Sequence, residues 1–354
     1  MPLGRRASRR DFFCGIAAAL LLTVPPLAGQ DDRTFVMGGG ARELGGHRFI
    51  PSSVAPDPFL TTRVTASLGV GGARNLAVPI RNLEDSLIKT ETGDLMFLGL
   101  ELEYQQRLAG WLVVRAGLGG SGRLGVDAFS FAAEGLSTVY GLNLGTTVGL
   151  WKSERFQVSA ALDYSSNSLF ATKPLTYLRN VAGEIERVID SIAGSGTPID
   201  SAVVDSVLDA IDLSQFSVTE SGSSARTSVG VRMAYAAAPW IGFTASLQTG
   251  VGDLIGSSST EHGIIDVAGS ASMDFGRLWK VPIGVALAAR YQNFNARAGD
   301  EVAGLTTVSA FIGYTGRRDL GLGLELTSAQ LGQPSTDQTI SVGRAALSIT
   351  YYFY

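Results

Sequence analysis

From residue 62 onward, apolar and polar residues alternate with a period of two in a long series of segments. In one of them, Leu100 and Leu102 alternate with Glu101 and Glu103. Successive side chains of a β-strand point to opposite faces, so this alternation predicts strands with one apolar and one polar face. About twelve such segments occur, near residues 62–72, 96–105, 112–119, 139–151, 156–165, 228–236, 241–251, 264–275, 281–292, 306–315, 320–327 and 339–354.

The connections between these segments alternate in length. Tight turns are predicted near residues 107–110, 152–155, 237–239, 276–278 and 316–319, and longer links at 73–92, 120–137, 166–226, 252–262, 293–304 and 328–338. Short turns at one end and long loops at the other are typical of bacterial outer-membrane barrels. The pattern therefore predicts an all-β fold, a transmembrane antiparallel up-and-down β-barrel of about 12 strands.

The aromatic residues are sorted along the predicted strands. All four tryptophans, Trp111, Trp151, Trp240 and Trp279, fall at the end where the turns are short. Amphipathic rings favour the membrane–water interface, so this sorting predicts an aromatic girdle. A soluble β-sandwich has no reason to place its aromatic residues in this way.

Composition narrows the class further. Hydrophobic residues make up 45% of the chain and charged residues only 17%, yet outside the first thirty residues we find no apolar run of about 18 residues, the length that a transmembrane helix needs. The formal net charge of −4 gives no reason to expect a nucleic-acid partner. The single cysteine, Cys14, lies in the leader described next, so disulfide chemistry is not expected in the processed chain.

The first thirty residues have the pattern of a cleavable secretory signal peptide. A basic stretch containing Arg5 and Arg6 precedes an apolar core that ends near Val24, which is too short to span a membrane. Arg9 and Arg10 also fit a twin-arginine export motif, so the export route stays open between that path and general secretion. We therefore predict a signal peptide at 1–30, a periplasmic or plug segment at 31–60 and an outer-membrane β-barrel at 61–354.

The final strand carries a resemblance to a known class. Residues 345–354 alternate in apolar character and end in aromatic residues, and this resembles the C-terminal recognition signal of Gram-negative outer-membrane β-barrel proteins. Leu347, Ile349, Tyr351 and Phe353 share one face, which places Tyr354 on the other. The resemblance implies an outer-membrane location in a diderm bacterium, after signal-peptide cleavage. It also implies outer-membrane lipid and the barrel-insertion machinery as partners, the latter through this strand.

The other face of the predicted strands carries charges of both signs. The lumen-lining candidates are Arg63, Glu101, Glu103, Arg115, Asp163, Arg232, Asp266, Asp274, Arg290 and Glu325. Such charges can pair into an internal salt-bridge network, because unpaired buried charge is costly, or they can line a polar channel. Many glycines share this face, so strand side chains alone should not fill the lumen.

Two segments outside the strand pattern are candidates to fill that space. The first is 31–60, which is rich in glycine and proline. The second is a predicted helical hairpin at 174–213 in the third external loop, either a lid folded on itself or a gate at the mouth. Its apolar residues recur at spacings of three and four, and the candidate gate residues are Leu178, Val181, Ile185, Val188, Ile192, Val204, Val207, Leu208 and Ile211.

The sequence offers little catalytic chemistry. The two histidines are His47, in the unpatterned segment, and His262, which lies near the serines of residues 257–259 but on the inward face. We therefore expect no enzyme, no cofactor and no metal site. The leading hypothesis is an outer-membrane channel or passive transporter for small molecules, with a preference for hydrophobic ones. The alternatives are a non-transporting envelope or adhesion barrel and, ranked last, an outer-membrane lipid hydrolase.

Overall fold

A computed structural model describes most of the chain beyond residue 41. The described residues are 42–81, 87–126, 136–172, 181, 183, 184, 186, 187, 190, 219–252, 262–294, 303–333 and 338–353. The signal peptide predicted at 1–30 lies outside these residues. Among the residues that the structure describes, no helix is long and apolar enough to span a membrane.

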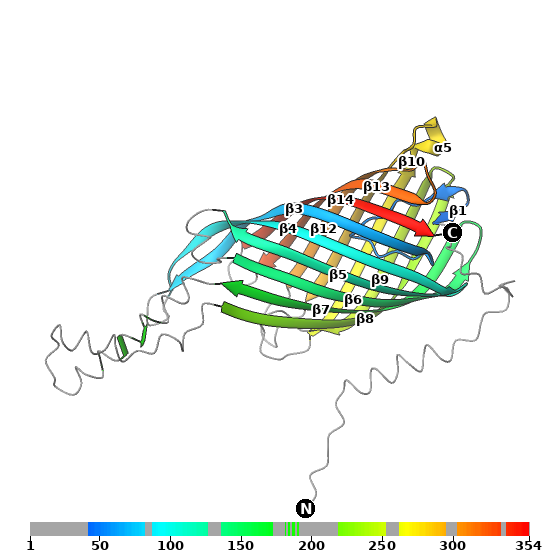
Figure 1. Ribbon diagram of the computed structural model, residues 1–354. Helices are drawn as coiled ribbons and strands as arrows, with labels where there is room; N and C mark the ends of the chain where they lie inside the picture. Colours follow the sequence, from blue (N-terminus) through cyan, green and yellow to red (C-terminus); the bar gives the residue numbers. More distant parts are fainter. Residues whose placement is uncertain are drawn as a thin grey trace, which may run out of the picture.

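Twelve long strands of the described chain form one closed antiparallel barrel (Figure 1). They are β3 (Thr62–Arg81), β4 (Leu87–Ala109), β5 (Leu112–Gly125), β6 (Leu136–Lys152), β7 (Phe156–Thr172), β8 (Thr219–Ala238), β9 (Ile241–Gly252), β10 (His262–Asp274), β11 (Ile283–Phe294), β12 (Ala303–Tyr314), β13 (Leu320–Gln333) and β14 (Gln338–Phe353). Each strand pairs with its sequence neighbours, and β14 closes the barrel on β3, in register from Ser341 opposite Arg74 to Phe353 opposite Thr62. The predicted fold class is confirmed.

Several strands continue past the ends that the sequence pattern predicted. β3 and β4 pair as far as Arg81 and Leu87, so most of the predicted loop at 73–92 is strand. In the same way, residues 120–125 belong to β5 and residues 328–333 to β13. The predictions of long links at 73–92 and 328–338 are therefore wrong. Beyond the apolar layer of a membrane both faces of a strand meet water, so backbone pairing continues after the hydrophobic alternation has ended.

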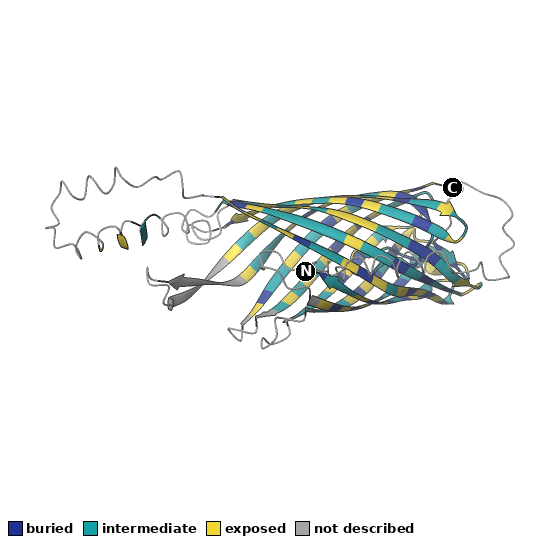
Figure 2. Cartoon of the chain, turned by 90° about the horizontal axis from the view of Figure 1, so that it is seen from below, coloured by how far each residue is buried: buried dark blue, intermediate teal, exposed yellow. Residues whose placement is uncertain are grey.

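The outer face of the barrel is apolar along its length. Figure 2 shows exposed and buried residues alternating along the strands. The outward residues include Leu118, 62% exposed, with Leu100 and Leu102 on the neighbouring strand β4. In the last strand, Leu347 and Ile349 are exposed as the sequence pattern predicted. Such a continuous exposed apolar surface is the face that a transmembrane barrel presents to lipid.

The two ends of the barrel differ. The end at which strand pairs join through short connections, called the turn end below, carries Trp111, Trp151, Trp240 and Trp279, as predicted. One of its connections is a short helix, α5 (Phe275–Trp279), where the sequence suggested only a tight turn. The opposite end is called the loop end.

The predicted hairpin at 174–213 lies almost entirely outside the described residues. Val181, Glu184, Arg187 and three neighbours are described and are helical, and Glu184 pairs with Arg187 one turn later. The other candidate gate residues fall outside the described part of the chain. The second helix and the role of the hairpin remain predictions.

Residues 42–61, called the inner segment below, run inside the barrel at the turn end. They contain one small two-stranded sheet, β1 (Glu43–Leu44) with β2 (His47–Arg48). The tight turn between these strands uses Gly45 and Gly46, whose φ angles of 54° and 79° favour glycine. The chain then continues through residues 49–61 directly into β3.

Candidate functional site

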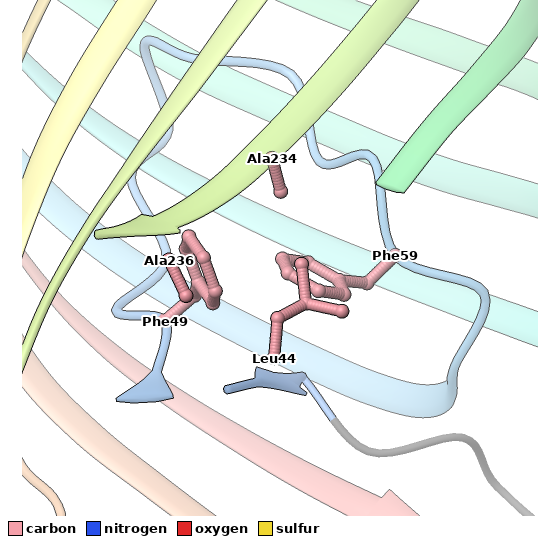
Figure 3. Close-up of a cluster of buried hydrophobic side chains, with 5 residues drawn as sticks. All are labelled: Leu44, Phe49, Phe59, Ala234 and Ala236. Carbon is pink, nitrogen blue, oxygen red and sulfur yellow. The ribbon is translucent and has the colours of Figure 1, made fainter. Parts of the chain in front are cut away.

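Apolar side chains seat the inner segment against the barrel wall. Leu44, Phe49 and Phe59 cluster with Ala234 and Ala236 of β8 (Figure 3). The rings of Phe49 and Phe59 lie 4.9 Å apart. Because the wall residues are alanines, the larger side chains of the inner segment fill the space that the strands leave empty. Smaller clusters continue this contact onto β10, β11 and β12.

The backbone of the inner segment bonds to side chains of the wall. The Pro58 carbonyl oxygen accepts hydrogen bonds from Gln157 Nε2 at 2.7 Å and from Ser159 Oγ at 3.2 Å. Gln105 Nε2 donates to the carbonyl oxygens of Phe59 and Thr61. Buried backbone groups of a segment without regular structure need such partners, since an unpaired buried group is costly. The side chains of the wall therefore supply the hydrogen-bond partners that regular secondary structure would otherwise provide.

Further along the inner segment, polar contacts reach the opposite side of the barrel. Ser52 Oγ lies 3.1 Å from Ser309 Oγ on β12 and donates to Glu325 on β13 at 2.9 Å. The backbone N–H of Ser53 donates to the same carboxylate at 3.1 Å. Arg48 donates to the carbonyl oxygen of Thr315 at 2.9 Å. The inner segment thus crosses the lumen and is bound on both sides.

Asp57 lies at the centre of a group of ion pairs in the inner segment. Its buried carboxylate pairs with Arg42 at 3.4 Å and with Arg63 at the start of β3. It also accepts the backbone N–H of Phe59 at 3.0 Å. Burial alone would raise the pKa of Asp57, but the guanidinium groups of Arg42 and Arg63 lower it below its ordinary value. The carboxylate therefore stays ionised where it ties the inner segment to the wall.

His47 makes the one histidine–serine contact among the described residues. Its Nε2 lies 2.9 Å from Ser272 Oγ on β10, and both side chains are buried. Burial lowers the pKa of His47 to about 4. A histidine–serine pair can act in hydrolysis, but this one is enclosed between the inner segment and the wall, where no substrate reaches it. It is a docking contact.

A chain of ion pairs runs along the inner face of the wall from β3 to β8, next to the inner segment. Arg63 on β3 donates to Glu103 on β4 at 2.8 Å, and Glu103 lies 3.7 Å from Arg115 on β5. Arg115 reaches Asp163 on β7 at 2.5 Å, and Asp163 also pairs with Arg232 on β8, which is only 2% exposed. These five residues, called the charged layer below, were all predicted from inward parity. The structure brings them together because strand pairing places these lumen-facing side chains within reach of one another.

Asp266 on β10 gathers a second set of polar partners. Arg226 Nη2 donates to it at 3.0 Å, Arg290 Nε at 2.9 Å and Gln292 Nε2 at 2.9 Å. The carboxylate is 1% exposed. Buried charge is tolerated when it is fully paired in this way. Asp266 and Arg290 were sequence candidates, and the structure places them side by side.

The remaining candidates lie elsewhere. Glu325 binds Ser52 and Ser53 of the inner segment, as described above. Asp274 lies at the turn end, where its carboxylate accepts the N–H of Gly276 and caps α5, so it supports a turn instead of lining open lumen. Glu101 pairs with Arg344 of β14 at 3.0 Å, nearer the loop end.

A cavity of about 400 Å³, called the vestibule below, opens on the loop-end side of the charged layer. Glu101 and Arg344 line it, and Glu101 stands one inward position from Glu103 of the layer. By contrast, the cavity beside the inner segment measures about 30 Å³, room for one or two water molecules. The described lumen is therefore roomy towards the loop end and filled towards the turn end.

Sequence reasoning missed several charged residues of this site, among them Arg42, Asp57, Arg226 and Arg344. Arg226 lies just before the predicted start of its strand, and Arg344 has inward parity in the last strand, so a wider use of parity finds both. Arg42 and Asp57 lie in the segment without strand pattern. Nothing in the local sequence marks these two as partners, because the contact depends on the path of the segment through the barrel.

No protein-family model and no curated protein matches the chain. Similar solved structures include the translocator domain of autotransporter NalP from Neisseria meningitidis, at 8% identity and a TM-score of 0.45, covering 82% of this chain and 88% of that one. An outer membrane channel from Pseudomonas putida F1 shows 9% identity and a TM-score of 0.48, covering 86% and 100%. The TodX monoaromatic hydrocarbon channel shows 12% identity and a TM-score of 0.41, covering 85% and 91%.

Matches at this level of sequence identity and TM-score assign neither an activity nor a solute to this chain. The fold assignment rests on the strand pairing and the apolar exterior of the chain itself. The described residues form a closed twelve-stranded barrel of the outer-membrane type, with residues 42–61 of the same chain inside its lumen.

Proposed function

We propose that this protein is an outer-membrane channel or passive transporter for small molecules, and that its inner segment closes the lumen at the turn end. The observation that carries the proposal is the contrast along the lumen. A 400 Å³ vestibule faces the loop end, and the inner segment fills the turn end. A barrel that served only as an anchor needs neither a vestibule nor a separate segment to fill the rest.

The contacts of the inner segment support a reversible closure. It is continuous with the wall at Thr62, where β3 begins, and it also holds to the barrel through side-chain hydrogen bonds, ion pairs, small apolar clusters and a backbone hydrogen bond from Gly45 N–H to the carbonyl oxygen of Glu154. Each such bond contributes about 1 kcal/mol, so the segment can detach without breaking the strand pairing of the barrel. In this proposal the turn end faces the periplasm, as short turns do in outer-membrane barrels.

A disulfide between the inner segment and the wall tests the proposal. Ser52 Oγ and Ser309 Oγ lie 3.1 Å apart, so cysteines at both positions bring two sulfurs within bonding reach. The chain without its predicted signal peptide contains no other cysteine. Single-channel currents in a planar bilayer are compared for the natural chain and for S52C/S309C, oxidised and then reduced.

We expect the natural and reduced chains to open in transient bursts and the oxidised chain to stay closed. The single variant S52C is the control, since the reductant should not change its currents. Openings that persist in the oxidised chain would show that solutes do not pass where the inner segment lies. A bilayer that stays sealed with every form, at all voltages, would reject the channel and favour a non-transporting envelope barrel.

A further inference from the structure

Helix α5 and the residues that follow it form an exposed apolar projection at the turn end (Figure 1). No residue of the helix is buried, and Trp279 is 65% exposed. Leu278, Val281 and Ile283, which begins β11, are exposed as well. These side chains therefore continue the apolar outer surface of the barrel past the end of the strand.

The helix is too short to be stable by itself. It has five residues, and isolated helices of this length do not persist in water. Asp274 caps its start, and the rings of Phe275 and Trp279 stack with their centres 4.9 Å apart. This stacking leaves every residue of the helix unburied, so the apolar side chains have to gain their cover from outside the protein.

Lys280 ends the helix in a conformation that is costly for lysine. Its φ angle of 60° lies in the left-handed region, and it is the one non-glycine among the described residues with a positive φ. Glycine or asparagine commonly occupies this position after a helix, because a Cβ is crowded there. A lysine at this place points to a use for its side chain.

The ammonium group of Lys280 makes no ion pair with any other residue that the structure describes. The acidic residues of α5 and of the segments beside it have partners of their own, which are Arg277 and Arg318 for Glu43, Arg317 for Asp319, and the N–H of Gly276 and hydroxyl of Thr315 for Asp274. Lys280 therefore adds an uncompensated positive charge at the edge of the apolar outer surface.

We propose that α5 and residues 280–283 anchor the turn end in the membrane interface and bind an anionic phospholipid there. Leu278, Trp279 and Val281 then lie at the outer part of the acyl chains, and Lys280 extends to the headgroup phosphate. Tryptophan and lysine both suit this depth, because each combines an apolar body with a polar tip. An anionic headgroup is preferred to a zwitterionic one because it supplies the charge that Lys280 lacks. The inference concerns the outer surface and holds whether or not the lumen conducts.

Fluorescence quenching by brominated lipids tests both parts of the inference, since bromine on an acyl chain quenches a tryptophan that contacts it. The purified protein is refolded into phosphatidylcholine vesicles that contain a minor fraction of brominated lipid. That lipid is either phosphatidylcholine or phosphatidylglycerol. The signal of Trp279 is the difference between the natural chain and W279F, which keeps Trp111, Trp151 and Trp240.

We expect both brominated lipids to quench Trp279, and phosphatidylglycerol to do so with about fivefold higher apparent affinity at low salt. Added salt should reduce this preference, because it screens exposed charges. Trp279 fluorescence that neither lipid quenches would overturn the anchor. Equal affinities of the two lipids at low salt would overturn the choice of an anionic partner.

Substitutions assign the preference to Lys280. K280Q should lose the roughly fivefold preference, whereas K280R should retain it. R155Q is the matched control, because it removes an exposed positive charge from the turn between β6 and β7, which β8 and β9 separate from α5. The preference at Trp279 should be unchanged in R155Q.

Quenching by brominated phosphatidylcholine should be the same in all three variants. Its loss in K280Q would give Lys280 a purely structural role and overturn its role at the lipid. A preference that survives in K280Q, or that R155Q lowers as much as K280Q does, would also overturn that role.

Discussion

At the scale of single residues, His47 shows how a docking contact acquires a pH dependence. Its ring is buried against Ser272 of the wall, and burial lowers its pKa from 6.5 to about 4. Asp274 opposes this shift, and Arg277 and Arg42 add to it. The neutral ring is therefore the form that the docked segment favours.

This shift predicts that acid loosens the inner segment. Because the folded pKa is lower than the unfolded one, the contribution of His47 is complete above pH 6.5. It is lost as the pH falls towards 4, by about 3 kcal/mol. The pKa of Asp57 is also lowered, so its contribution is lost only below its ordinary value of 3.8. Amide hydrogen exchange of residues 43–59, corrected for the intrinsic pH effect with an unstructured peptide, should rise between pH 6.5 and 4.

His47→Gln is the matched variant for this measurement. It cannot gain a proton in that interval, so protection of the inner segment should no longer change between pH 6.5 and 4. Equal pH dependence in the natural chain and in His47→Gln would assign the effect to another group.

At the scale of elements, the inner segment fits the wall through small residues at close approaches. A Cβ at Gly242 of β9 would meet the His47 ring and would lie 2.6 Å from Phe49 Cε1, and one at Gly284 of β11 would lie 2.5 Å from Ile50 Cδ1. Glycine weakens a strand, so its presence here matches the need for space.

The close approach at Gly242 predicts that G242A displaces the inner segment without opening the barrel. We expect faster hydrogen exchange in residues 43–59 and more frequent channel openings, because the added methyl group overlaps two docked rings. Exchange in the pairing strands β8 and β10 should stay slow. G122A is the control, since a Cβ there meets nothing within 4 Å. Equal exchange of the inner segment in the two variants would contradict this account of the fit.

At the scale of the whole molecule, the barrel divides its surroundings into lipid outside and a polar lumen inside. The outward residues form an exposed apolar surface, and the inward charges pair with one another. This division predicts that a charged residue on the outer surface destabilises the barrel more in the middle of the membrane than near its edge. Leu118, near the middle of β5, lies where hydrocarbon should surround it, whereas Leu278 of α5 lies at the turn end.

We therefore expect L118R to lower the free energy of unfolding from lipid vesicles by about 2–4 kcal/mol and L278R to lower it by less than about 1 kcal/mol. The measurement is the urea midpoint and slope of tryptophan fluorescence in vesicles. Equal losses in the two variants would show that the outer surface has no depth-dependent lipid contact.

The sequence by itself determined the barrel, its strand number and its lumen-facing parity. These follow from a local rule, since alternate side chains of a strand point to opposite faces whatever lies further away. Parity thus identified Glu103, Arg115 and Asp163 as inward residues before any contact was known.

Only the tertiary structure decided which inward residues meet and what fills the lumen. The pairing of Asp163 with both Arg115 and Arg232 depends on how far neighbouring strands are offset around the closed barrel. The path of residues 42–61 depends on contacts with strands more than a hundred residues away, and no periodic pattern in the segment records them. The period-two pattern within each strand therefore specifies the barrel wall. The position of the inner segment is specified by its fit to the inner surface, which exists only once the barrel has closed.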